Sequence, residues 1–343
     1  MKAAIVTQYN KNDLTLKMTT VDKPQITADQ VLLKVSAAGV NPLDNMITRG
    51  EVKLIVPYKL PVIGGNEVVG KIEAVGANVT QFSIGERVFS RLPLDSIGAF
   101  AEYVAVDANA IAKVPPYLSD VQAAAIPLTA LTVMQAFELM QVKKGNTIFI
   151  SGGTGGVGAM AIPLAKAKGL KVITNGSVEN KERVLALGVD CFIDYKTEDY
   201  TQTVANVDYV LDTLGGQETE KQMTIMKRGG QLVSLKGMPN GAFAKRMGFT
   251  GLKRLLFSFA GRKFDKMAQK YGVTYNFIFV QANGAQLAEV AKLFTKLELK
   301  PSLDTVYAFS DVNAALDKVA NGRSRGKTVL DLQQGENNGL SFN

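Results

Sequence analysis

The sequence predicts an α/β protein of two domains, one of mostly antiparallel β structure and one built on a doubly wound parallel sheet. Its 343 residues exceed what a single hydrophobic core usually supports. Roughly the first 115 residues contain short β-branched segments separated by Gly, Pro, Asn and Asp, a pattern typical of strands and turns. From residue 146 onward, compact apolar runs alternate with helix-length segments, which indicates a parallel sheet covered on both faces.

These patterns divide the chain into three stretches. We expect residues 1–120 and 276–343 to form the antiparallel domain, and residues 121–275 to form the parallel one, with a basic insert at about 240–271. In the antiparallel domain, strands are expected at 2–7, 30–37, 67–75, 86–91, 102–106, 275–280 and 328–332. Helices are expected at 286–297 and 312–319 in this domain, and a helix at 121–139, after Pro115 and Pro116, is expected at the start of the parallel domain. The polar tail from 333 to 343 is expected to be frayed.

The parallel domain repeats one rhythm of strand and helix. Strands are expected at 147–150, 171–174, 191–194, 208–212 and 231–235. Helices are expected between them, at 158–168, 180–187, 198–205 and 217–226.

Composition restricts the class of protein. No run approaches the ~20 apolar residues that span a bilayer, and the first residues turn polar too soon for a signal peptide. Cys191 is the only cysteine, so an intramolecular disulfide is impossible and a cytoplasmic location is expected. The net charge of +8 suits a polyanionic ligand. Because Lys and Arg are dispersed and no aromatic-plus-basic signature occurs, a dinucleotide phosphate is favoured over nucleic acid.

The chain contains no histidine. A Ser-His-Asp triad, a histidine general base and a histidine-ligated metal are therefore excluded. With one cysteine, a thiolate-rich zinc site is excluded as well.

A glycine-rich turn follows the expected strand at 147–150. Gly153, Gly155 and Gly158 have the spacing G-x-G-x-x-G, and Thr154, Gly156 and Val157 complete the turn into the next helix. Such glycines make the turn tight, let the backbone approach a pyrophosphate and let the helix pack closely on the strand. The helix N-terminus adds free N–H groups. This context predicts a dinucleotide site of the Rossmann type.

The next strand indicates which nicotinamide cofactor is used. An NAD site places an acid ~20 residues after the first glycine, on the ribose 2′-hydroxyl. Here the strand ends in Thr174 and Asn175, followed by Gly176 and Ser177 and then by Lys181 and Arg183 in the next helix. A hydroxyl and a cation attract a 2′-phosphate, so NADPH is predicted. Glu179 and Glu182 leave open a merely solvated turn of mixed charge.

With these motifs in their order, the chain resembles the medium-chain dehydrogenase/reductase superfamily, and within it the zinc-independent quinone oxidoreductase branch that includes zeta-crystallin and plant enone oxidoreductases. The resemblance covers nearly the whole length. It rests on the glycine motif and on residues 38–44 (Ala-Gly-Val-Asn-Pro-Leu-Asp), 64–67, 75–79, 85–88, 98–103, 126–132, 187–190, 193–195, 211–216 and 326–330. It implies that the antiparallel domain is GroES-like and that the active site is the cleft between the domains.

The resemblance also implies particular site residues. Zinc-dependent relatives have metal ligands at the positions of Asn41 and Asn66, so no metal is expected here. Tyr195 is expected to pack on the adenosine and bond the 2′-phosphate. Further cofactor contacts are implied for Asn41, Thr129, Gly215, Gly216, Gly237, Met238, Phe277, Phe279, Val280 and, at the pyrophosphate, Lys327.

The proton donor departs from the family pattern. Many relatives have a Tyr shortly after the position of Asp44, where this chain has Met46. Tyr58, Lys59 or solvent are the remaining candidates, and Asp44 itself is either catalytic, with Asn41, or structural.

The resemblance implies an NADPH-dependent reductase, commonly a homodimer, that transfers a hydride from nicotinamide C4 to a quinone or an α,β-unsaturated carbonyl. Such substrates accept the developing charge on their own oxygen, so a site without zinc or histidine is adequate. Two alternatives stay open. One is a non-catalytic NADPH-binding protein, and the other is a membrane-surface or partner-binding protein that uses the basic segment 245–270.

The insert carries its own signal. Phe249, Leu252, Leu255, Leu256 and Phe259 recur at spacings of three and four, with Lys and Arg largely elsewhere around the helix. A basic amphipathic helix of this kind either folds over a cleft or lies on a membrane. We favour a substrate lid, because both flanks of the insert are expected at the nicotinamide.

Overall fold

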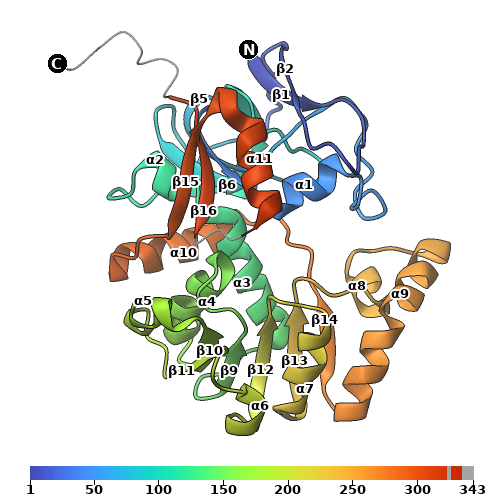
Figure 1. Cartoon of the computed structure of the whole chain (residues 1–343). Helices are drawn as coiled ribbons and strands as arrows, with labels where there is room; N and C mark the ends of the chain where they lie inside the picture. The colour runs from blue at the N-terminus through green and yellow to red at the C-terminus, as the bar shows by residue number, and fades with distance from the viewer. Residues whose placement is uncertain (323–325, 334–343) are drawn as a thin grey trace. The chain divides into compact units, whose positions relative to one another are not determined.

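A computed structural model describes residues 1–322 and 326–333 (Figure 1). The chain forms two compact units. Unit 1 comprises Met1–Leu131 and Gln281–Asn343, and unit 2 comprises Thr132–Val280.

Unit 1 is the antiparallel part. Its main sheet has the strand order β15-β16-β3-β5-β6-β8, with β7 paired to β3, and a second sheet has the order β2-β1-β4. Neighbouring strands are antiparallel except β15 and β16. The strands are β1 Lys2–Val6, β2 Lys17–Thr20, β3 Gln30–Val40, β4 Val62–Ile63, β5 Glu67–Val75, β6 Arg87–Arg91, β7 Tyr103–Asp107, β8 Ile111–Lys113, β15 Leu303–Ala308 and β16 Lys327–Asp331.

Helices and one buried cluster complete unit 1. The helices are α1 Pro42–Thr48, α2 Asp120–Ala123, α3 Pro127–Met140 (which continues into unit 2), α10 Gly284–Leu297 and α11 Val312–Asn321, with 3₁₀ turns η1 Ala108–Ala110 and η3 Phe309–Asp311. The alternating apolar positions of β3 meet Phe100 and the apolar face of α11 in a single core that includes Leu33 and Leu316.

Unit 2 is a parallel sheet with the order β11-β10-β9-β12-β13-β14. Its strands are β9 Thr147–Ile150, β10 Lys171–Gly176, β11 Cys191–Asp194, β12 Val207–Asp212, β13 Met226–Ser234 and β14 Thr274–Phe277. Its helices are α4 Gly156–Ala167, α5 Lys181–Ala186, α6 Tyr200–Thr203, α7 Gln217–Thr224, α8 Gly241–Arg246 and α9 Gly251–Tyr271, with the 3₁₀ turn η2 Val178–Asn180. Counted from β9, the order is 3-2-1-4-5-6, the arrangement of Rossmann domains.

The predicted fold class is confirmed, and several boundaries are corrected. The helix expected at 121–139 is two helices, because Pro127 lacks an N–H and disfavours helical backbone at the residue before it. The strand expected at 275–280 ends at Phe277 and pairs with β13, so it extends the sheet of unit 2. The unit boundaries accordingly fall at 131/132 and 280/281, not at 120/121 and 275/276. Of the tail expected to be frayed, residues 334–343 lie outside the described residues.

Short elements are what the sequence reading missed. It did not predict α1, β2, β4, β8 or β15. It also found no run long enough to cross a membrane, whereas residues 120–140 meet that test by length and composition. The 18-residue window of that stretch which meets the test is 78% buried within the structure, as expected for helices in a protein core.

The insert at 240–271 folds as α8 followed by α9. Phe249 lies between the two helices, not on the amphipathic helix as expected, and its ring stacks on Phe257 at 5.5 Å between centroids. The four apolar side chains expected to face a substrate pocket, those of Leu252, Leu255, Leu256 and Phe259, are exposed.

Candidate functional site

The glycine turn of unit 2 is built by close backbone packing. A Cβ on Gly153 would lie 2.1 Å from Thr174 Oγ1, and one on Gly158 would lie 2.4 Å from the carbonyl oxygen of Gly152. The turn is fastened to the end of β10, because the N–H of Gly153 donates to the carbonyl of Asn175 at 3.0 Å and that of Gly152 donates to Asn175 Oδ1 at 2.8 Å. The fold of the turn therefore requires glycine at positions 153 and 158.

The start of α4 is open. Gly155 is its N-cap and makes no side-chain cap, and a Cβ on Gly156 would meet nothing within 4 Å. Free N–H groups and open space at a helix N-terminus suit a pyrophosphate. The residues of this turn therefore fit the dinucleotide that the sequence predicts.

The residues predicted for the adenosine end gather where β10 and β11 end. Gly176 and Asp194 are register partners, and the N–H of Tyr195 donates to the carbonyl of Gly176 at 3.2 Å. Ser177 follows β10 directly and Lys181 is exposed at the start of α5. The strand tip carries Thr174 and Asn175 but no acid. Thr174 Oγ1 donates to the carbonyl of Ile150 at 2.6 Å, and Asn175 Oδ1 accepts from the glycine turn.

Arg183, the second cation of α5 after Lys181, contacts the glycine turn. Its Nη2 donates to the carbonyl of Thr154 at 2.8 Å, which ties α5 to the glycine turn. Lys196 and Glu179 form an exposed ion pair of 2.8 Å nearby. Glu179 thereby faces a cation at this strand end, which reduces its repulsion of a phosphate.

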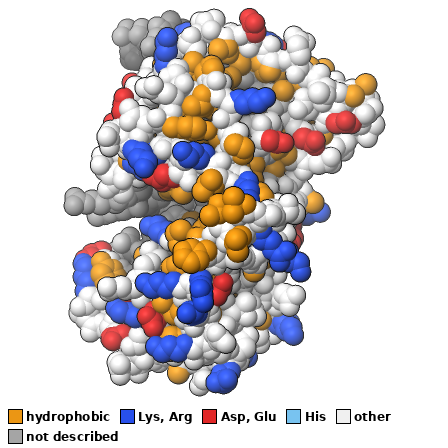
Figure 2. Space-filling view, turned by 90° about the vertical axis from the view of Figure 1, so that its right-hand side faces the viewer, with side chains coloured by type: hydrophobic (Ala, Val, Ile, Leu, Met, Phe, Trp, Pro, Cys, Tyr) orange, Lys and Arg blue, Asp and Glu red, His pale blue; other side chains and the backbone are white. Residues whose placement is uncertain are grey.

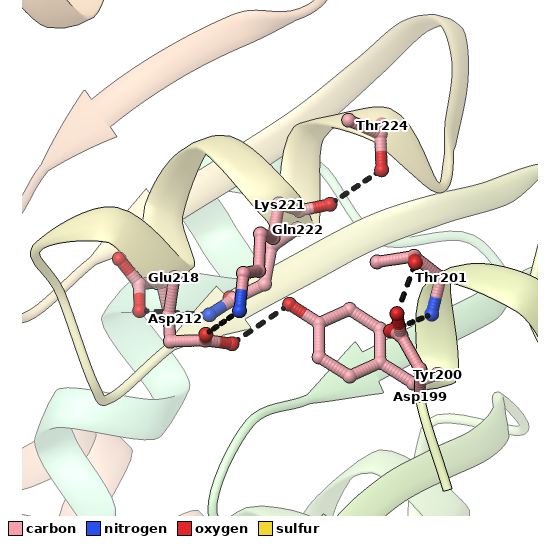
Figure 3. Close-up of polar contacts among 8 residues, drawn as sticks. All are labelled: Asp199, Tyr200, Thr201, Asp212, Glu218, Lys221, Gln222 and Thr224. Carbon is pink, nitrogen blue, oxygen red and sulfur yellow. Dashed lines mark hydrogen bonds and ion pairs between the residues drawn. The ribbon is translucent and has the colours of Figure 1, made fainter.

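The loop after β12 is held by Asp212, which is fully buried. Its Oδ1 accepts from the N–H of Gly215 at 2.8 Å, and Thr219 and Ser234 donate to its Oδ2 at 2.7 and 2.8 Å. Figure 3 shows Gln222 reaching the same carboxylate from α7, beside the bond of 2.9 Å from the Tyr200 hydroxyl to Glu218. Gly215 and Gly216 are therefore positioned by a buried carboxylate with satisfied oxygens.

The last cofactor positions of unit 2 lie at the ends of β13 and β14. A Cβ on Gly237 would lie 2.0 Å from the Tyr275 hydroxyl, which donates to the carbonyl of Met238 at 2.9 Å. The carbonyl of Phe277 accepts from Arg246 Nη2 at 2.6 Å, so a side chain already uses that backbone acceptor. Phe279 is half-buried and Val280 is buried.

In unit 1, α1 brings three of the predicted residues together. Asn41 caps the helix, and its N–H donates to Asp44 Oδ2 at 2.7 Å. Asn66 Nδ2 donates to Asp44 Oδ1 at 2.7 Å. The two asparagines that replace the family's zinc ligands are buried, and both serve as hydrogen-bond donors to carboxylates.

Glu67 joins this group to the C-terminal part of the chain. It is fully buried; its Oε2 accepts from Asn41 Nδ2 at 3.0 Å and forms an ion pair of 2.5 Å with Lys327 Nζ. Lys327 Nζ also donates to Asn41 Oδ1 at 2.5 Å. The N–H of Leu128 donates to Glu67 Oε1 at 2.7 Å, which places the first turn of α3, with the buried Thr129, beside the carboxylate.

Arg91 adds a second buried cation to this group. Its side chain is fully buried opposite Glu67 on the neighbouring strand, and Nη1 donates to the carbonyl of Leu92. Its Nε and Nη2 have no partner among the described residues, and neither has Asn66 Oδ1. Burial lowers the pKa of Arg91 to about 10, and electrostatic interactions with Tyr58, Asp44 and Glu67 oppose this shift. Two buried carboxylates and two cations make the group neutral overall.

Burial also raises the pKa of the two titratable candidates, Asp44 and Tyr58. It raises the pKa of Asp44 to about 6, although the bonds from Asn66 and Asn41 and the charge of Lys327 oppose the shift. It raises the pKa of Tyr58 to about 12, so the phenol keeps its proton at neutral pH. Lys59 is exposed.

Sequence reasoning missed Glu67 and Arg91 as site residues. Each lies at an end of a predicted strand, beside small or apolar residues: Glu67 precedes Val68-Val69-Gly70, and Arg91 follows Val88-Phe89-Ser90. A charged residue at such a position is the signal that was available, because Glu and Arg are almost never fully buried unless paired.

The glycine turn at residues 152–158, which we call the nucleotide cradle, and the fold together define a dinucleotide-binding protein of the two-domain dehydrogenase class. Comparisons with known proteins agree. Residues 27–116 match the alcohol dehydrogenase GroES-like domain, and residues 187–330 match the family described as zinc-binding dehydrogenase. A mitochondrial NAD(P)H oxidoreductase of Danio rerio, RTN4IP1, is 30% identical over 97% of this chain and 92% of its own length. The 2-methylene-furan-3-one reductase of Solanum lycopersicum is 30% identical over 96% of this chain and 79% of its own length.

Solved structures agree as well. The quinone oxidoreductase from Coxiella burnetii has a TM-score of 0.81 and 28% identity, covering 97% of this chain and 99% of that one. The chain therefore belongs to the medium-chain dehydrogenase/reductase superfamily, in its quinone oxidoreductase-like branch. It is an NAD(P)H-dependent oxidoreductase of the quinone and enone reductase family.

Proposed function

We propose that this protein is a zinc-free, NADPH-dependent reductase of quinones or α,β-unsaturated carbonyl compounds. The observation that carries the proposal is the glycine turn before α4, open at Gly156 and followed by a strand tip without an acid. Bound there, the cofactor would supply a hydride. Cofactor binding is assigned to unit 2, and contacts to the nicotinamide ribose and the substrate are assigned to Asn41, Thr129 and Tyr58 of unit 1.

The preference for NADPH follows from Ser177 and Lys181. Their hydroxyl and ammonium groups suit a 2′-phosphate, and a charge-assisted contact of about 1.5–3 kcal/mol corresponds to a preference of roughly ten- to a hundredfold. Lys181→Ala should weaken NADPH binding at least about tenfold and leave NADH binding unchanged. Lys171→Ala, at the opposite end of β10, is the matched control. Fluorescence titration measures both, and equal affinity of the parent for NADPH and NADH would refute the preference.

Metal independence is supported by the contacts of the two asparagines. Asn41 and Asn66 donate to Glu67 and Asp44, and neither amide is a good zinc ligand. We therefore expect purified protein to contain far less than one zinc per chain by elemental analysis. Chelators should leave turnover intact, whereas stoichiometric zinc would contradict this part of the proposal.

Tyr58 is the candidate donor to the substrate oxygen. Because its pKa is raised to about 12, it stays a phenol across the working range and is a hydrogen-bond donor to an oxygen that gains negative charge. Tyr58→Phe should lower kcat about ten- to a hundredfold at every pH. Rates equal to those of the parent would leave protonation to solvent.

The substrate class is tested by NADPH oxidation with 1,4-benzoquinone, 9,10-phenanthrenequinone, enals and cyclic enones. Selective turnover identifies the class, and tight NADPH binding without turnover on any of them favours the non-catalytic alternative. A cytoplasmic location and a homodimer remain predictions, which cell fractionation and light scattering test.

A further inference from the structure

The strongest feature outside the proposed site is the outer face of α9. We define it as Leu252, Leu255, Leu256, Phe259, Arg262, Lys263 and Lys266, which follow one another at helical spacings of three and four. Its four apolar side chains are 72%, 65%, 52% and 76% exposed, in that order. Apolar side chains thus occupy the first half of the face and basic ones the second half.

The opposite face is fixed to the rest of unit 2. Phe257, Gly261 and Ala268 are its buried positions, and a Cβ on Gly261 would lie 2.3 Å from Asn240 Cβ. Phe257 packs edge-on against Phe243 at 5.7 Å between centroids. Because helix and neighbour are in such close contact, α9 cannot turn its outer face inward without breaking this packing.

Charge indicates what covers the outer face. Residues 241–271 contain eight Lys and Arg side chains and one acid, Asp265, which accepts from Asn240 Nδ2 at 2.7 Å. Arg262, Lys263 and Lys266 form no ion pair with any described residue. Figure 2, which looks onto the side where α8 and α9 lie in Figure 1, shows apolar side chains gathered together with Lys and Arg beside them.

We propose that the outer face of α9 binds the surface of a bilayer containing anionic phospholipids. Leu252, Leu255, Leu256 and Phe259 would enter the boundary of headgroups and acyl chains, and Arg262, Lys263 and Lys266 would meet the lipid phosphates. A second copy is disfavoured, because a two-fold contact would bring the same excess of positive charge from both chains together. The inference concerns a surface distinct from the nucleotide cradle and does not depend on the proposed function.

The experiment is vesicle co-sedimentation of the full chain. We expect the parent protein to bind phosphatidylcholine vesicles mixed with phosphatidylglycerol at least about tenfold more tightly than phosphatidylcholine alone. Leu255→Ser with Phe259→Ser should lose about tenfold in affinity. Arg262→Glu, Lys263→Glu and Lys266→Glu together should lose at least about a hundredfold, at about fivefold for each of the three cations removed.

Matched controls distinguish binding by this surface from nonspecific adsorption to vesicles. Ile84→Ser removes an apolar side chain that is 66% exposed elsewhere, and Lys292→Glu with Lys296→Glu reverses two exposed charges on α10. Both controls should bind vesicles like the parent, and the far-ultraviolet circular dichroism spectrum should be unchanged in every variant, as a check of folding.

Two outcomes overturn the proposal. In the first, the parent protein binds no anionic vesicle, and a changed KM for a substrate in the outer-face variants then assigns the face to a lid. In the second, the outer-face variants bind vesicles like the parent, and loss of a dimer of the parent in those variants then assigns the face to a second copy.

Discussion

The candidate residues of unit 2 and those of unit 1 differ in which atoms form the binding surface. In unit 2, backbone forms the cradle, and its open space begins at Gly156, where an added Cβ would touch nothing within 4 Å. In unit 1, side chains form the site and most are already bonded to one another, as Asn41 is to Glu67 and Lys327. Removing one partner of a buried ionic group is strongly destabilising, whereas the turn of unit 2 is sensitive to side-chain atoms that are added to its glycines.

Breaking the ion pair of Lys327 with Glu67 tests the buried ionic group of unit 1 and should give the largest change in stability. Lys327→Met leaves the fully buried Glu67 without its cation, so we expect a loss of about 3–5 kcal/mol in the free energy of unfolding. Urea denaturation measures it. Lys113→Met removes a comparable pair of 2.6 Å with Glu86 whose Lys side chain is 60% exposed, and should cost under about 1 kcal/mol.

Adding Glu67→Gln to Lys327→Met should recover most of the loss, because the uncompensated charge is then gone. Equal costs for Lys327→Met and Lys113→Met would mean that burial does not distinguish the two pairs, and the contrast between the units would fail.

Two glycines of one turn test the unit 2 side. Gly158→Ala forces a Cβ to within 2.4 Å of the Gly152 carbonyl oxygen and should cost about 1–3 kcal/mol of stability. Gly156→Ala has room in the protein and should leave stability unchanged or slightly raised. It should nevertheless weaken NADPH binding at least about tenfold, since the methyl group occupies the space assigned to phosphate. Unchanged NADPH affinity in Gly156→Ala would remove the pyrophosphate from this position.

The same contrast explains what the sequence could predict. The strand at 147–150 and the glycine turn were found because they are local: their residues are contiguous and their geometry depends on glycine itself. The break in the helix before Pro127 is equally local, but the prediction missed it because the apolar residues around Pro127 continue a helical pattern. The short helix α1 and strands such as β4, with two residues, are too brief to show a period.

The unit 1 site could not be assembled from the residues alone. Glu67 meets Lys327 across 260 positions of chain, and it faces Arg91 only because of the register between β5 and β6. Family resemblance supplied Asn41 and Lys327 as cofactor contacts. The structure instead shows what their side chains touch within unit 1, and Lys327 at the pyrophosphate stays a prediction.

Asp44 gives the smallest and most specific test, because its titration reports the balance within the buried group. Its pKa is raised to about 6 by burial, above its usual value of 3.8. A carboxyl that holds its proton more tightly when folded stabilises the fold fully below the unfolded pKa, and that contribution is lost as pH rises through the folded pKa. Between about pH 5 and pH 8 the loss is about 1.4 kcal/mol.

Asp44→Asn has no such titration. The variant is expected to be less stable than the parent at the lower pH, because an amide replaces one of the two oxygens that accept from Asn66 and the Asn41 N–H. Its deficit should shrink by about 1.4 kcal/mol between about pH 5 and pH 8, as the ionised carboxyl of the parent becomes costly. Denaturation curves of both proteins across this window measure the difference. A deficit that stays constant, or grows with pH, would mean that Lys327 and the hydrogen bonds outweigh burial and keep Asp44 ionised throughout.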